Sequence, residues 1–105
     1  MAKYAIDFDG VLCDRQGLPR VGSFKDCAPN DYAVEAIKCL RRNHHEFYIL
    51  TNREEKEWKD IYEWLKYNGF PKMRITNIKE KGTTIYLDDR AVRFTNWLDF
   101  CKLIE

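Results

Sequence analysis

Two pairs of aspartates each follow a short apolar run, a placement that suits metal-assisted chemistry. Asp7 and Asp9 come after one run near the N-terminus, and Asp88 and Asp89 come after another. Carboxylates brought together in that number repel one another unless a cation lies among them. Hard oxygen ligands suit Mg²⁺, which usually also shares phosphate oxygens with a substrate. The spacing therefore predicts a Mg²⁺ site that handles phosphate.

The first pair could divide the work of moving a phosphoryl group. One carboxylate can attack phosphorus to give an aspartyl-phosphate, and the other can protonate the leaving oxygen and later activate water. A bend at Gly10 would aim Asp9 differently from Asp7. Thr51 could hydrogen-bond a phosphoryl oxygen, and Lys79 could neutralise developing charge. With the cation, these residues form a complete set of parts for phosphoryl transfer.

The elements that must position these residues alternate along the chain. Apolar runs predict strands at 4–6, 47–50, 73–76 and 83–87, and helical periodicity predicts helices from residue 30 or 31, over 54–68 and from residue 95. This alternation favours a parallel sheet covered by helices on both faces. The carboxyl ends of the strands then share one edge, where open α/β sheets bind ligands.

Local signals mark the ends of the helices. Asn30 or Asp31 would cap the first helix at its start. Gly69 stands where the second helix would end on a residue of positive φ, and Pro71 follows it.

Size and composition narrow the class of protein. The 105 residues, 1–105, suffice for one domain. A net charge of +1 gives no global bias toward nucleic acid or membrane, and no apolar run approaches the ~20 residues that span a bilayer. The four cysteines form no Cys-x-x-Cys pair, and no secretion signal precedes them. We therefore expect reduced thiols in a cytoplasmic protein, and no zinc site.

The motifs resemble, in order, the four motifs of the haloacid dehalogenase superfamily. The matching segments are Asp7-Phe8-Asp9-Gly10-Val11, Ile49-Leu50-Thr51, Lys79 and Leu87-Asp88-Asp89. The resemblance implies a three-layer Rossmann-like fold with a parallel sheet of about four strands in the order 3-2-1-4. It also implies that Asp7 is the nucleophile and Asp9 the acid and base. Lys81 is the alternative to Lys79 as the lysine of the third motif.

The resemblance further implies a metal and a type of reaction. In this family Mg²⁺ is bound by the nucleophile carboxylate, by the backbone carbonyl two residues later and by the acid of the fourth motif, here Asp7, Asp9 and Asp88. Asp89 would lie nearby or act through water. Because an Asp two residues after the nucleophile marks members that transfer phosphate, Asp9 favours a phosphatase over a dehalogenase.

The gaps between motifs are too short for a cap domain, since 11–29 and 52–78 hold only a loop, one helix and one strand. The chain thus resembles the capless class, whose open sites accept bulky substrates or borrow a neighbouring subunit as a lid. We expect the substrate to be contacted by four residues near the predicted mouth: Gly10, Asn52, Arg53 and Arg90.

A nucleic-acid end is one candidate substrate, beside a nucleotide or a small phosphate ester. Further basic residues near the mouth could contact a nucleic-acid backbone, namely Arg15, Arg20 and Lys25. Phe24 could stack on a base. The plainer interpretation is that the charges are solvated and that Phe24 belongs to the core.

Trp58 and Trp64 are six residues apart on one helix and cannot share a face, so one of them could serve a contact in a homo-oligomer.

The leading hypothesis is a Mg²⁺-dependent phosphomonoester hydrolase with an Asp7 phosphoenzyme. Two alternatives stay open. One is a phosphotransferase that passes the phosphoryl group to an alcohol, and the other is a non-catalytic metal-binding or regulatory module of the same fold.

Overall fold

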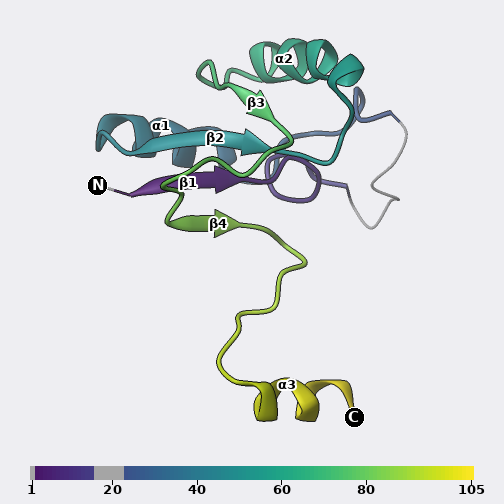
Figure 1. Ribbon diagram of the computed structural model, residues 1–105. Coiled ribbons are helices and arrows are strands. Elements are labelled where there is room, and N and C mark those ends of the chain that lie inside the picture. The colour runs from purple at the N-terminus through teal and green to yellow at the C-terminus, as the bar shows by residue number, and fades with distance from the viewer. Residues whose placement is uncertain (1, 16–22) are drawn as a thin grey trace.

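Four parallel strands form the centre of the computed structural model, which describes residues 2–15 and 23–105. The strands are β1 (Lys3–Ile6), β2 (Glu46–Leu50), β3 (Ile75–Thr76) and β4 (Ile85–Leu87), and they lie side by side in the order β3-β2-β1-β4 (Figure 1). The helices are α1 (Ala33–Arg42), the short 3₁₀ helix η1 (Glu55–Glu57), α2 (Trp58–Tyr67) and α3 (Trp97–Ile104). The predicted α/β fold with sheet order 3-2-1-4 is confirmed.

The core lies on one face of the sheet. Ile6 of β1 is in register with Ile49 of β2, and Ile49 with Ile75 of β3, so the three side chains point to the same side. Helices α1 and α2 cover this face with Ile37 and Trp64, both almost fully buried. Each buried aliphatic side chain contributes about 1.5–3 kcal/mol by leaving water. This shared core fixes how the strands, and hence the residues after them, sit relative to one another.

The opposite face is covered by an irregular connection instead of a helix. Tyr48 of β2 is fully buried there. Its hydroxyl accepts a hydrogen bond from the backbone N–H of Glu80 (3.0 Å) and lies 2.7 Å from the hydroxyl of Thr83, so its polar end is satisfied by the connection that covers it. The prediction placed helices on both faces, whereas α1 and α2 share one. The physical reason is length: the connection from β3 to β4, residues 77–84, must cross three strand spacings, about 14 Å, and it is shorter than the dozen or so residues of a helical crossover.

The helix-end signals had different outcomes. Gly69 follows α2 with φ of 82°, as predicted. The predicted Asx cap of α1 is wrong, since the residue before the helix is Tyr32 and no side chain caps it. The Asn30 amide instead donates to the backbone carbonyls of Gly10 and Val11, at 3.1 and 2.8 Å. It therefore stabilises the loop that follows β1 and carries the first motif.

Helix α3 stands apart from the rest of the fold (Figure 1). Its first turn is capped by Asn96, whose side-chain oxygen accepts a hydrogen bond from the Asp99 backbone N–H at 2.9 Å. Every residue of α3 is exposed, including its apolar ones. Across the part of the chain that the structure describes, no helix is both long enough and apolar enough to cross a bilayer.

Candidate metal and phosphate site

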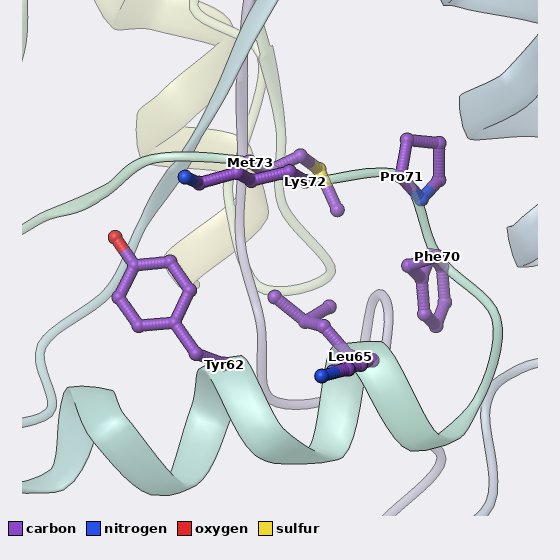
Figure 2. A pocket seen from close by; sticks show the side chains of 7 residues that line it. Tyr62, Leu65, Phe70, Pro71, Lys72 and Met73 are labelled. Atoms are coloured by element: carbon purple, nitrogen blue, oxygen red, sulfur yellow. The ribbon is translucent and has the colours of Figure 1, made fainter.

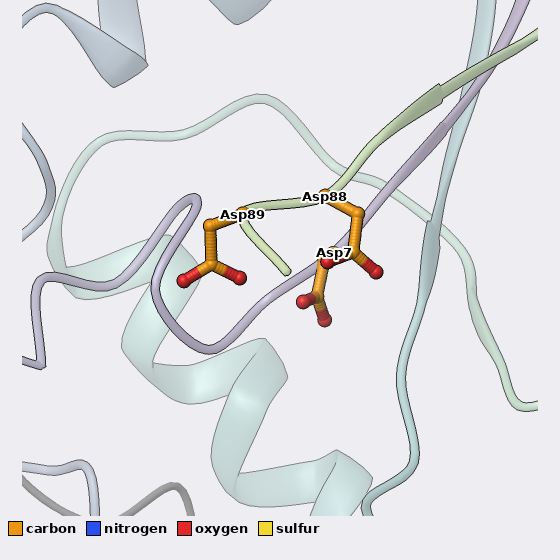
Figure 3. A group of neighbouring side chains, drawn as sticks. All are labelled: Asp7, Asp88 and Asp89. Atoms are coloured by element: carbon orange, nitrogen blue, oxygen red, sulfur yellow. The ribbon is translucent and has the colours of Figure 1, made fainter. Parts of the chain in front are cut away.

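Three aspartates meet where β1 and β4 end. Asp7 follows β1, Asp88 and Asp89 follow β4, and one carboxylate oxygen from each lies within 4.8 Å of the other two (Figure 3). The two strands are neighbours in the sheet, and the backbone N–H of Asp7 donates to the carbonyl of Leu87 at 3.0 Å. Because parallel neighbours end at the same edge, the apolar strands alone bring these carboxylates together.

Burial, together with the neighbouring negative charges, raises the pKa of Asp7 from 3.8 to about 6. Partial burial is the largest cause, because it disfavours the charged carboxylate; repulsion from Asp88 comes next, with smaller contributions from Asp89 and Asp9. The Phe8 backbone N–H, which donates to Oδ1 of Asp7 at 2.8 Å, acts in the opposite direction. Asp7 is thus a carboxylate that a nearby cation would stabilise.

The donor set fits Mg²⁺. Three carboxylates supply hard oxygen ligands, and Mg²⁺ completes its octahedron with waters or phosphate oxygens. Ligand oxygens of such an octahedron are about 3 Å apart when adjacent and about 4.2 Å apart when opposite, so three oxygens within 4.8 Å of one another would move closer together around a bound ion. Asp88 is already oriented by its turn, since its Oδ1 accepts a hydrogen bond from the Arg90 backbone N–H at 2.8 Å.

Asp9 is not part of this acidic group and pairs with arginines instead. Its carboxylate is buried and forms a two-pronged pair with Arg53, with Nε 2.8 Å from Oδ2 and Nη2 2.9 Å from Oδ1. Arg15 adds a longer contact, its Nε lying 3.7 Å from Oδ1. The expected bend at Gly10 is present, with φ of 83°. Among the residues described, the structure therefore groups the carboxylate of Asp7 with those after β4 and that of Asp9 with two arginines.

Arg53 was expected to contact a substrate, and the structure places its guanidinium in the interior. Its Nη1 lies 3.0 Å from Oε1 of Glu57, and its Cζ lies 4.6 Å from the centre of the Phe24 ring. Its backbone N–H donates to the Thr51 hydroxyl at 3.1 Å, and Thr51 is buried too. The spacing of Arg53 and Glu57, four residues apart, is the one sequence signal for this arrangement.

The other basic residues near the predicted mouth have diverse surroundings. Arg15 is buried, and Nζ of Lys25 lies 3.9 Å from Oδ1 of Asp60 on the surface. Arg20 lies outside the described residues. Stacking of Phe24 on a base is wrong for this structure, because its ring is 3% exposed and packs edge-on against Phe8.

The remaining candidates lie on the surface. Asn52 and Arg90 are exposed just beyond the ends of β2 and β4. The Lys79 ammonium lies 5.4 Å from the centre of the Tyr86 ring, on β4. Lys81 is also exposed, and its backbone carbonyl accepts a hydrogen bond from Nζ of Lys3 at 3.0 Å. The contact with Tyr86 brings Lys79 to the strand that carries Asp88, so Lys79 stays our prediction for the third motif.

A separate hollow of about 690 Å³ lies between α2 and the segment that precedes β3 (Figure 2). Its walls include Tyr62 and Leu65 of α2 and the residues 70–73. Because 70–73 lead into the amino end of β3, this hollow lies at the sheet edge opposite to the acidic group. It is therefore not part of the candidate site.

Comparisons with known proteins give a partial likeness to a nucleotidase. A Bacillus cereus protein with the curated name "Putative nucleotidase" is 35% identical over 48 residues, which are 46% of this chain; the chain spans a quarter of that protein's length. A solved structure of a conserved protein from Bacteroides thetaiotaomicron matches with a TM-score of 0.65 at 24% identity, over 99% of this chain and 90% of the other. No family model matches the sequence. The structural likeness supports the α/β fold described above.

The raised pKa of Asp7 predicts a pH-dependent cost to folding. Between about pH 4 and 6 the folded state binds more protons than the unfolded chain. The free energy of unfolding therefore falls as the pH rises through this range, and the stability that protonated Asp7 contributes is lost above pH 6. Without divalent cations at pH 7.5, Asp7→Asn should raise the free energy of unfolding by about 1–2 kcal/mol, allowing for solvent screening. Thermal melts should show a gain of about 5 °C, which disappears near pH 4.

The control for this prediction is Asp26→Asn, which alters an exposed carboxylate away from the acidic group. It should leave the melting temperature unchanged at both pH values. Millimolar Mg²⁺ should stabilise the native protein more than Asp7→Asn, because a ligand of the folded state raises stability by mass action. An Asp7→Asn protein that melts below the native one at pH 7.5 would contradict the electrostatic argument.

Proposed function

We propose that this protein is a Mg²⁺-dependent phosphomonoester hydrolase that works through an aspartyl-phosphate on Asp7. The observation that carries the proposal is the convergence of Asp7, Asp88 and Asp89 at the carboxyl ends of two neighbouring parallel strands. Bound Mg²⁺ would supply positive charge to the phosphoryl oxygens. The four free cysteines accord with a reducing cytoplasm, where we place the protein.

The residues of the chain divide the reaction between them. Asp7, ionised above its pKa of about 6, attacks phosphorus with a carboxylate oxygen, and the bond from phosphorus to the leaving oxygen breaks. Asp9, two residues on, gives the leaving oxygen its proton and then takes one from the water that hydrolyses the acyl phosphate. Thr51 and Lys79 hydrogen-bond the phosphoryl oxygens. For this work the carboxylate of Asp9 must part from Arg53, which engages both of its oxygens.

We further propose that the substrate is a nucleotide. The likeness to a protein named a nucleotidase supports this choice over other phosphate esters. The acidic group lies partly open to solvent, because Asp88 and Asp89 are exposed. An open mouth leaves room for a base and a sugar beyond the phosphate that Asp7 attacks.

A substrate panel tests the reaction and the substrate class together. Release of inorganic phosphate should be measured with Mg²⁺ for 5′- and 3′-nucleotides, sugar phosphates, phosphorylated oligonucleotides and an aryl phosphate. We expect nucleotides to give the highest kcat/KM and excess EDTA to abolish turnover. Hydrolysis that is fastest with oligonucleotide ends would replace the proposed substrate, and turnover unaffected by EDTA would contradict the proposed metal dependence.

One observation favours a second candidate, a non-catalytic module that binds a divalent cation. Both oxygens of Asp9 are engaged by the buried Arg53, an arrangement that suits a structural ion pair as well as a resting enzyme. Such a module would bind Mg²⁺ in calorimetry and release no phosphate from any member of the panel. Turnover that is lost in Asp7→Asn would exclude this candidate.

A further inference from the structure

The segment after β4 carries a large apolar surface that faces solvent. Trp97 is 70% exposed and Ile104 66% exposed, although both belong to the well-capped helix α3. Trp97 also contacts Phe94 and Phe100 edge-on, with ring centres 5.3 and 5.7 Å away, so the aromatic side chains gather on one side. Single exposed apolar residues are ordinary, whereas a contiguous group of this kind marks an interaction surface.

A matching gap lies over β4. Ile85 and Leu87 are in register with Tyr4 and Ile6 of β1, so they point to the sheet face that α1 and α2 cover. Ile6 is 1% exposed there, but Ile85 and Leu87 are 36% and 42% exposed. The helical layer thus ends before β4 and leaves an apolar surface exposed on this strand. Its chemistry matches that of the apolar side chains of α3.

The apolar surface of α3 is wider than one sheet face needs. At about 100° per residue, the six apolar residues of α3 cover an arc of about 220°. A helix that covers one layer needs a stripe somewhat wider than about 100°. If α3 packed on a sheet face, some of its apolar side chains would therefore remain exposed. These side chains could pack against the α3 helix of a second copy of the chain.

The shape of the chain also points away from a closed monomer. Its radius of gyration is 14.9 Å, whereas a compact chain of this length has about 13 Å. The connection 88–96 runs away from the sheet and holds α3 at a distance from the chain's own β4 (Figure 1).

We propose that two copies of this chain exchange their C-terminal helices. The α3 of each copy covers Ile85 and Leu87 of the other, and the remaining apolar side chains pack the two α3 helices against each other around a two-fold axis. An aromatic side chain buries about 150–250 Å², so the exposed parts of Phe94, Trp97 and Phe100, with the aliphatic residues and the two receiving strands, bury on the order of 1,000 Å² in total. This reaches the size of a specific interface.

The oligomeric state gives the first test, and it does not depend on any activity. Light scattering on a size-exclusion column should give twice the 12.6 kDa chain mass at micromolar concentration. The double substitution Trp97→Glu with Ile104→Glu should weaken the dimer at least a hundredfold and give a monomer. The matched control Tyr67→Glu alters an aromatic residue of α2 that is 90% exposed and should leave the dimer intact. A native protein that is monomeric up to several hundred micromolar would overturn the proposal.

A disulfide test separates exchange from folding back onto the same chain. One ¹⁵N-labelled chain carries Ile85→Cys and Cys101→Ser, an unlabelled chain keeps Cys101, and both carry Cys39→Ser to remove an exposed thiol. After mixing and mild oxidation, mass spectrometry should find a disulfide that joins position 85 of the labelled chain to Cys101 of the unlabelled one. A single chain with both thiols should then give a covalent dimer. A link formed only within one chain would overturn the exchange, and circular dichroism checks that each variant is folded.

Discussion

Asp7→Asn should lower kcat for the best substrate of the panel by about three orders of magnitude or more while the fold stays intact. The amide has the size of the carboxylate and lacks its charge, so it neither attacks phosphorus nor attracts Mg²⁺. Because the acidic group forms at the ends of two paired strands, removing one charge relieves repulsion and leaves the backbone in place. Initial rates of phosphate release, compared with a circular dichroism spectrum, measure both effects.

Two controls make this result specific. Asp26→Asn removes an exposed carboxylate elsewhere and should keep the native rate. Rapid acid quenching after mixing with ³²P-labelled substrate should trap label on the native protein and none on Asp7→Asn. If Asp7→Asn hydrolysed phosphate at the native rate, Asp7 would not be the nucleophile and the proposed reaction would fail.

Arg53→Met should destabilise the protein by about 3 kcal/mol, because it leaves the carboxylate of Asp9 buried without its two-pronged partner. The value lies at the low end for a buried pair, since Arg15 remains 3.7 Å from the same carboxylate. For a domain of this size the melting temperature should fall by about 12 °C. Thermal melts and urea titrations give the two quantities directly.

The double variant Asp9→Asn with Arg53→Met isolates the ion pair. It removes both charges, so it should recover at least half of the stability lost in Arg53→Met. Arg90→Met removes an exposed guanidinium of the same size and should change stability by less than about 0.5 kcal/mol. An Arg53→Met protein that melts within 2 °C of the native one would show that the pair contributes little.

The sequence was most informative where a strand ends in polar residues. The apolar runs of β1 and β4, each followed by aspartates, predicted that four carboxylates would share one edge, because parallel strands carry their carboxyl ends to the same side. The structure brings together those of Asp7, Asp88 and Asp89, whereas the fourth, Asp9, pairs with Arg53. Which residues lie at this edge depends on where the apolar runs end and on how strands and helices alternate along the chain. Both can be read from the sequence.

What the sequence left open depends on contacts between distant side chains. Nothing in the spacing of Asp9 and Arg53, 44 residues apart, indicates that they form a buried pair. The same holds for Asn30, whose amide was free to cap a helix or to bind the loop at Gly10, and tertiary packing selected the loop. The extended connection 88–96 could not be predicted either, because the periodicity of α3 describes its faces and not the surface that they cover.

The hydrogen bond from the Asp7 N–H to the Leu87 carbonyl joins the candidate site to the least protected part of the sheet. Strand β4 has three residues and one neighbouring strand, and such edges open locally at a lower free energy than global unfolding requires. Each local opening of β4 moves Asp88 and Asp89 away from Asp7 and separates the three carboxylates. An ion bound there can stay no longer than β4 remains paired with β1, so the rate of local opening of this strand sets an upper limit on its residence time.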